Sequence, residues 1–174
     1  MAMPTTVLAA LNFVCEWRNP MERNGVRRRL DAAVARLVHD DVYLLANNLG
    51  ERCIAARLAM YLQSEFPHHN VDAEYNRDAD TPKRLGLPDE CSNARDEHGE
   101  SLVVPDVIVH RRGAEGPNIL VLEVKKTSNP APRDCDRARI HAFRAQYGYE
   151  FAALIECETR AGHEPAAGVA EWLG

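Results

Sequence analysis

Long apolar segments are missing from this sequence. No stretch of the 174 residues reaches the roughly 18–20 consecutive apolar positions that a membrane-spanning helix requires. The N-terminal apolar stretch Val7–Cys15 is much shorter, follows no basic residues, and is not followed by a small-residue cleavage site. We therefore expect neither a membrane span nor a signal peptide, and we expect a cytoplasmic location.

Cysteine spacings typical of structural modules are also missing. The cysteine count is five, an odd number, and no C-x-x-C occurs; the positions are Cys15, Cys53, Cys91, Cys135 and Cys157. This pattern indicates neither a disulfide framework nor a zinc module, and it favours a reducing compartment. Cys91 and His98 share a loop, but two potential ligands do not make a metal site.

Positive charge is not in excess: the formal net charge is −5. This balance argues against a protein that coats a polyanion along its whole surface. It does not exclude nucleic acid, because a local basic patch or a bound metal can supply the attraction. Internal repeats and low-complexity segments are absent too, so the length suits one domain spanning residues 1–174. Residues 1–26 are expected to form either a short docking helix or an extension with little order.

Apolar periodicity predicts an α/β fold. Repeats at helical spacing predict helices over residues 27–39, 49–65 and 133–147. Alternating or β-branched-rich runs predict strands over residues 71–76, 102–109, 119–124 and 151–157, with a short tail element ending near Trp172. Within the first strand, Asp72 and Glu74 are expected on a solvated face. A strand–helix–strand crossover after a hairpin predicts a mixed four-stranded sheet with helices on both faces.

Residues 77–100 are polar, contain two prolines and show no periodicity, which predicts a long loop. Arg77, Lys83 and Arg84 lie in this loop and are candidates for weak phosphate contacts. Ordinary surface charge is the simpler interpretation of these three residues.

Acidic residues interrupt both strands of the central hairpin. Asp106 lies in the first apolar run and Glu123 in the second, and Lys125 shares a strand face with Glu123 because side chains alternate. They could instead be a strand-start residue and an exposed cross-strand charge cluster, but that explanation must hold at three positions together. Burying such charges without a role is costly, and paired carboxylates suit a Mg²⁺ ion. The hairpin is therefore a candidate metal site.

Glu51 lies at the edge of the inward-facing stripe of the second predicted helix, from which it could reach the sheet. A second interpretation, helix capping, is favoured by the spacing alone. Asn48 and Glu51 form an N-x-x-E pair that resembles a capping box, and an acid in a first helical turn also suits the helix dipole.

The pattern Pro105-Asp106 … Glu123-Val124-Lys125, with the helix ERCIAARLAMYLQSEFP before it and a helix and strand after it, resembles the PD-(D/E)xK nuclease superfamily. The resemblance covers about residues 48–158, and the sequence is similar to small bacterial members. It implies the restriction-endonuclease-like fold, an α-β-β-β-α-β core. It also implies Mg²⁺ or Mn²⁺ held by Asp106, Glu123 and the Val124 carbonyl.

The same resemblance implies that Lys125 orients or deprotonates the attacking water and that Glu51 supports the metal. The superfamily's Gln-x-x-x-Tyr motif is not matched, because position 150 is glutamate. Gln146 is therefore kept only as a weak phosphate contact. The expected function is a Mg²⁺-dependent nuclease acting on nucleic acid, with DNA favoured, and a homodimer is compatible with it. The alternative is a catalytically degenerate nuclease-fold module that binds nucleic acid or protein.

Overall fold

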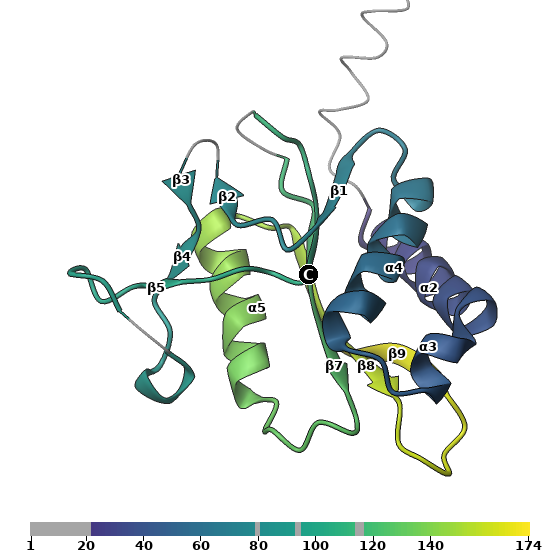
Figure 1. The fold of residues 1–174 in the computed structure, drawn as a ribbon. Helices are drawn as coiled ribbons and strands as arrows, with labels where there is room; N and C mark the ends of the chain where they lie inside the picture. The colour runs from purple at the N-terminus through teal and green to yellow at the C-terminus, as the bar shows by residue number, and fades with distance from the viewer. Residues whose placement is uncertain (1–21, 79–80, 93–94, 114–116) are drawn as a thin grey trace, which may run out of the picture.

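The structure is a computed structural model that describes residues 22–78, 81–92, 95–113 and 117–174. Its centre is a five-stranded mixed sheet with strand order β1-β6-β7-β8-β9 (Figure 1). Only β7 and β8 pair in parallel, and the other neighbours are antiparallel. The strands are β1 (Asn70–Ala73), β6 (Val107–His110), β7 (Leu120–Lys126), β8 (Phe151–Glu158) and β9 (Ala166–Leu173).

Helices cover both faces of this sheet. α2 (Arg23–Asp40), α3 (Val42–Ala46) and α4 (Glu51–Glu65) lie on one side, and α5 (Asp134–Tyr147) lies on the other (Figure 1). α5 is the crossover connection between β7 and β8, the two neighbouring strands that run parallel. The predicted mixed α/β arrangement is therefore confirmed. The sheet gains one strand over the prediction because the tail pairs with β8 along its length.

Strand alternation divides the apolar residues between two cores. On β7, Leu120, Leu122 and Val124 pack toward α2 and α4, whereas Val121 packs toward α5. Because side chains alternate, Glu123 and Lys125 take the α5 side with Val121. The sequence pattern of β7 thus places its charged residues under α5.

The predicted strand over residues 102–109 is wrong, because the structure divides it in two. Ser101–Leu102 (β5) pairs with Arg84–Leu85 (β4) as a separate ribbon, and β6 begins only at Val107. Pro105 lies between them and has no N–H to donate to a ladder, which explains the break. The predicted loop over residues 77–100 holds short ordered elements as well: β2 (Arg77–Asp78), β3 (Thr81–Pro82), β4 and the 3-10 turn η1 (Asp89–Cys91).

The first helix begins earlier than the sequence indicates. α2 starts at Arg23, and Val26 in its first turn is fully buried. Residues 23–26 therefore belong to the folded domain, while the prediction for residues 1–21 lies outside the described residues. No helix in the described ranges is long and apolar enough to cross a bilayer.

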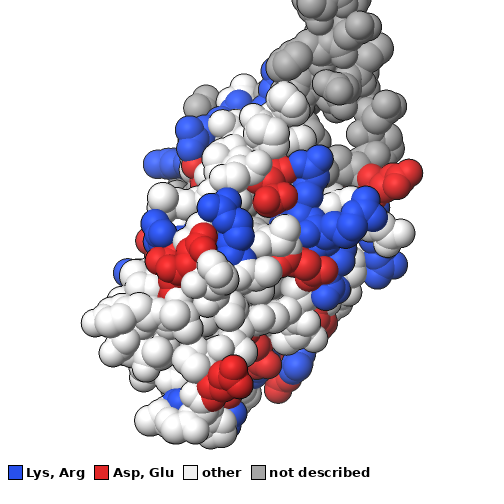
Figure 2. Space-filling model, turned by 90° about the vertical axis from the view of Figure 1, so that its right-hand side faces the viewer, with Lys and Arg blue, Asp and Glu red and all other residues white. Residues whose placement is uncertain are grey.

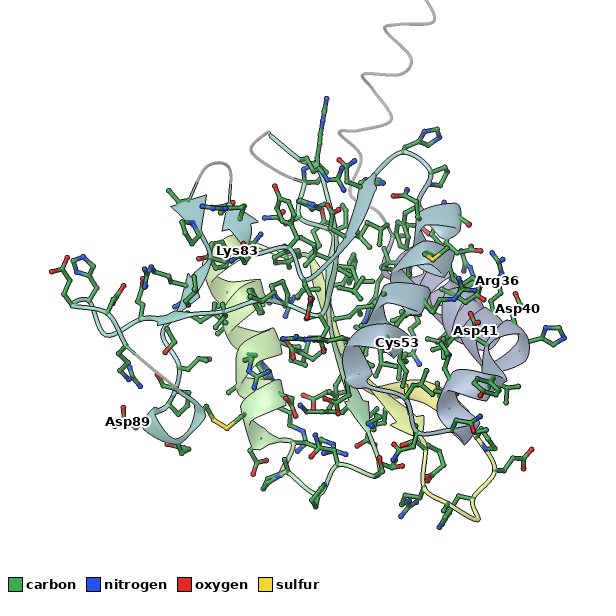
Figure 3. All side chains as sticks on the ribbon, viewed as in Figure 1. Arg36, Asp40, Asp41, Cys53, Lys83 and Asp89 are labelled. Atoms are coloured by element: carbon green, nitrogen blue, oxygen red, sulfur yellow. A yellow bond between two sulfur atoms is a disulfide. The ribbon has the colours of Figure 1, made fainter. Side chains whose placement is uncertain are left out.

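Two of the cysteines are joined, which corrects the expectation of unpaired thiols. Cys91 at the end of η1 and Cys135 in the first turn of α5 form a disulfide across a sequence separation of 44 residues (Figure 3). Cys53 is a free, exposed thiol and Cys157 a free, buried one. Spacing could not reveal the pair, because connectivity depends on which segments the fold brings together.

Candidate functional site

The sheet brings the two strand acids together. Val107 on β6 is paired with Leu122 on β7 in antiparallel register, so the residues flanking that pair, Asp106 and Glu123, take the same side of the sheet. Asp106 lies one residue before β6, and its Oδ2 accepts a 2.7 Å hydrogen bond from the Val124 N–H. Carboxylates 17 positions apart in the sequence (123 − 106) thus become neighbours.

Asp106 is an acid that is hard to ionise. Burial raises the pKa of its carboxyl to about 6, and the hydrogen bond from Val124 and the charge of Lys125 oppose that rise. The nearby charge of Glu51 adds to it. The neutral form of this carboxyl is therefore favoured mainly by its removal from water.

Glu123 is enclosed more completely, with 2% of its surface exposed. Its Oε2 lies 3.1 Å from a terminal nitrogen of Arg139, while its Oε1 is buried and finds no hydrogen-bond partner among the described residues. Burial, followed by the charge of Asp106, raises its pKa well above the usual value, and Arg139 offsets part of that rise. A buried carboxylate oxygen without a partner is costly, which is a mark of a site awaiting a cation or a donor.

α5 contributes two residues that the sequence analysis missed. Asp136, 2% exposed, and Arg139 lie one turn apart, with Asp136 Oδ1 3.5 Å from the Arg139 guanidinium. A signal was present, because Asp136 continues the buried stripe of Ile140 and Phe143 at i, i+4 and i+7. An acid on the apolar face of a helix is the same anomaly that marked the two strand acids.

Lys125 lies between two helices. Its Nζ is 3.2 Å from Asp136 Oδ1 on α5 and 3.7 Å from Glu51 Oε2 on α4, and its side chain is 15% exposed. The ammonium is therefore held at a defined position beside Glu123 on the same strand face. This restricted placement suits a residue that orients a small ligand.

Glu51 joins α4 to the end of β7. Its Oε1 accepts hydrogen bonds from the Lys126 N–H at 3.1 Å and from the Asn129 side-chain amide at 3.2 Å. The capping-box interpretation is wrong: Gly50 is the N-cap, without a side-chain cap bond. The side chain of Asn48 instead accepts a 2.8 Å bond from the Ser128 hydroxyl.

Lys83 is not a surface charge, contrary to the simpler expectation. It is 1% exposed, and its ammonium donates to the Arg77 carbonyl. The ammonium also lies 5.3 Å and 5.7 Å from the ring centroids of Tyr75 and Tyr147. Burial lowers its pKa. A contact between this enclosed ammonium and a phosphate is therefore not supported by its position.

The weak phosphate candidates lie at the far end of α5. Gln146 is exposed and follows Asp136 by ten residues, a rise of roughly 15 Å along a helix. Arg77 lies beside Lys83, which packs on Tyr147 at the same helix end. The structure therefore does not bring Arg77, Lys83 and Gln146 together with Asp106.

Asp72 is not on a solvated face either, because it forms a second polar cluster. Its Oδ2 is 2.8 Å from His110 Nε2 and also accepts a 2.8 Å bond from Arg112 Nε, and its side chain is 11% exposed. Burial lowers the pKa of His110, although Asp72 opposes that change. Glu74, in contrast, is exposed and pairs with Arg52.

A cavity of about 260 Å³ adjoins the acids through Arg139. Arg139 forms part of its wall and contacts Glu123 at the same time. The rest of the lining consists of residues from the polar loop and from β5 and the turn after it: Leu87, Cys91, Ser101, Leu102, Val103 and Val104.

The opposite side of the molecule offers no uniform charge. Figure 2, which views the side of α2 and α4, shows Lys and Arg interleaved with Asp and Glu. Several of these arginines are paired with acids. Those pairs are Arg27 with Asp31, Arg36 with Asp40, Arg52 with Glu74 and Arg57 with Asp41. A single basic surface for nucleic acid is therefore not apparent on this side.

The carboxylates of Asp106 and Glu123 suit a hard cation that keeps several bound waters, rather than a cation coordinated only by protein ligands. Among the described residues, no group of three or more His, Cys, Asp and Glu side chains is placed to hold a metal ion. Asp106 and Glu123 supply two carboxylates, and Glu123 Oε1 is free to accept a ligand. Mg²⁺ commonly uses one or two carboxylates and keeps several waters, so the residues fit that ion.

Comparison of the chain with protein-family models, curated proteins and solved structures finds no match.

Proposed function

We propose that this protein is a Mg²⁺- or Mn²⁺-dependent nuclease of the PD-(D/E)xK type, with the restriction-endonuclease-like fold. The single observation that carries the proposal is Glu123 Oε1, which has no hydrogen-bond partner among the described residues and is buried beside Asp106, on the same strand face as Lys125. The ion pairs of this cluster account for the other oxygen of Glu123, for Asp136 and for Lys125, but they leave this oxygen unexplained.

Each residue has a task in phosphodiester hydrolysis. Asp106, Glu123 and the Val124 carbonyl would hold the ion, which would neutralise phosphate charge and lower the pKa of water. Lys125 binds a phosphate oxygen or orients the attacking water, since its ammonium projects from the same face as Glu123. Glu51 and Asp136 position Lys125, because its Nζ lies 3.7 Å and 3.2 Å from them.

DNA is the substrate that the superfamily resemblance favours, and a cytoplasmic location and a homodimer are part of the same proposal. An enzyme of this kind needs only a local positive centre, which agrees with a net charge of −5.

A second candidate is a nuclease-fold module that binds nucleic acid or protein without cutting. The observation that favours it is Arg139, which already places a positive charge 3.1 Å from Glu123. A guanidinium there can replace the ion electrostatically. Calorimetric titration separates the candidates, because heat of Mn²⁺ binding that is lost in Glu123→Gln supports the enzyme, and no heat in the parent supports the module.

The test of activity uses the parent and two variants. Single-stranded, duplex and branched DNA, and RNA, are incubated with Mg²⁺ or Mn²⁺. We expect cleavage by the parent and a loss of at least about 100-fold in Asp106→Asn and Lys125→Met. Arg52→Ala, an exposed change next to Glu51, is the matched control and keeps activity. Equal products from the parent and Asp106→Asn, or none from either, contradict the catalytic proposal.

A further inference from the structure

The cavity beside Arg139 has the properties of a binding site in its own right. Its volume of about 260 Å³ lies between α5 and the segment from Leu87 to Val104. Arg139 is shared between the cavity wall and the carboxylate of Glu123. Only the side chain of Arg139 therefore separates a ligand in the cavity from the carboxylates where we place the scissile phosphate.

The rim of this cavity exposes apolar surface. Leu102 is 55% exposed and Val104 43% exposed, and Val104 precedes Asp106 by two residues. These two are among only five large hydrophobic side chains exposed in the described part of the chain. Apolar side chains beside the plane of one guanidinium suit the face of a nucleobase.

The described parts of the cavity wall are tied to one another and to α5. The Cys91–Cys135 disulfide ties the wall segment to the first turn of α5. Arg95 adds hydrogen bonds to the Gly99 carbonyl at 2.6 Å and to the Leu87 carbonyl at 2.5 Å. A preformed wall lowers the cost of ordering a loop on binding.

We propose that this cavity receives one unpaired nucleobase of the substrate strand, next to the phosphate at Asp106 and Glu123, so that the substrate class is single-stranded nucleic acid or an unpaired end. The inference rests on the proposed function for the position of the phosphate. A base stacked within a duplex cannot enter the cavity unless it leaves the stack, whereas an unpaired base enters at no such cost. The lining offers little hydrogen-bonding pattern, so the site accepts any base.

Binding is measured apart from cleavage, in the Asp106→Asn background. Fluorescence anisotropy compares a labelled single-stranded deoxyoligonucleotide with a blunt duplex of the same sequence, in Mg²⁺. We expect the single strand to bind at least about tenfold more tightly, because its base enters the cavity without the cost of leaving a duplex stack. A 2-aminopurine in the single strand reports entry of the base by a change in its emission.

Rim variants and matched controls locate the effect. Leu102→Glu and Val104→Glu are expected to weaken single-strand binding about tenfold and leave duplex binding unchanged. Met60→Glu and Val42→Glu, at 59% and 43% exposed positions on α4 and α3 across the sheet, should change it less than twofold. Circular dichroism confirms that all four variants fold.

Equal affinity for single strand and duplex, no binding of either, or equal effects of rim and control variants overturns the inference. Failure of the proposed nuclease function has a different signature: single-strand binding that depends on Leu102 and Val104, together with no cleavage by the parent in Mg²⁺ or Mn²⁺.

Discussion

The guanidinium of Arg139 on α5 lies 3.1 Å from the carboxylate of Glu123 on β7, so a helix supplies the counter-charge for a strand acid that is 2% exposed. Asp136 shares this guanidinium at 3.5 Å, but Asp136 also has Lys125 at 3.2 Å. Removing Arg139 therefore leaves Glu123, rather than Asp136, without a cation.

This asymmetry gives the first prediction. Arg139→Met should lower the free energy of unfolding at pH 8, without divalent cation, by about 2–3 kcal/mol, because the buried carboxyl of Glu123 loses its hydrogen-bond donor. Combined with Glu123→Gln, the same substitution should cost much less. Urea unfolding of both single variants and the double variant measures the coupling. Arg137→Met, which breaks a more exposed pair with Glu171, is the control and should cost at most about 1 kcal/mol. Additive effects of Arg139 and Glu123 would contradict the pairing.

The raised pKa of Asp106 makes stability depend on pH in an unusual direction. The unfolded chain releases this proton near pH 3.8 and the folded chain near pH 6, so the folded state holds more protons between these values. Stability contributed by this group is therefore lost as the pH rises from about 4 to about 6. Asp106→Asn, which cannot ionise, should become more stable than the parent over that range, by on the order of 2–3 kcal/mol at pH 7 without divalent cation.

Denaturant unfolding at a series of pH values measures this difference. Asp89→Asn removes one negative charge at an exposed side chain on the edge of the molecule, away from the sheet, and is the control (Figure 3). A difference between Asp106→Asn and the parent that stays constant from pH 4 to 7 would show that the carboxyl is not held out of solvent as described.

The Cys91–Cys135 disulfide predicts a redox dependence of stability. Closing a loop of 44 residues restricts the unfolded chain by about 4 kcal/mol in the chain-entropy account. Reduction, or Cys91→Ser, should lower the melting temperature by roughly 8–16 °C for a chain of this size. Cys53→Ser, at a free exposed thiol, is the control. Disulfides are rare in a reducing cytosol, so finding the Cys91–Cys135 bond in protein isolated without reductant would count against the proposed cytoplasmic location. Identical melting with and without reductant would contradict the bond.

Glu51 should stabilise the junction between α4 and β7. Glu51→Ala removes the acceptor of the Lys126 N–H and of the Asn129 amide, and we expect a loss of about 1–3 kcal/mol. Arg52→Ala, on the next residue of the same helical turn, breaks only an exposed pair and should cost less than about 1 kcal/mol. Thermal unfolding of the two variants compares them directly. Equal losses of stability would show that Glu51 contributes no more than an exposed acid in the first turn of a helix.

The sequence predicted the parts of this site that depend on local periodicity. Strand alternation placed Glu123 and Lys125 on one face, and the crossover helix required β7 and β8 to be parallel neighbours. It did not predict Arg139 as a partner of Glu123, because their contact depends on how α5 lies across the sheet. Nor did it predict the burial of Lys83, since the nearby Tyr75 and the distant Tyr147 together enclose its ammonium.

Two errors had identifiable causes. The apolar run predicts a strand through Pro105, but the missing N–H of this residue ends the ladder and leaves Asp106 just outside β6. The spacing of Asn48 to Glu51 predicts a cap, but the Asn48 side chain accepts a hydrogen bond from Ser128, eighty residues later. In the second case a short-range pattern competes with a contact that only the tertiary structure reveals.

The central claim is that Asp106 and Glu123 hold a divalent cation. Anomalous diffraction from a crystal soaked in Mn²⁺ tests it most directly. We predict one peak between the two carboxylates, at about 2.1 Å from an oxygen of each. A map without density at that position, with Glu123 still bound to Arg139, would contradict the account.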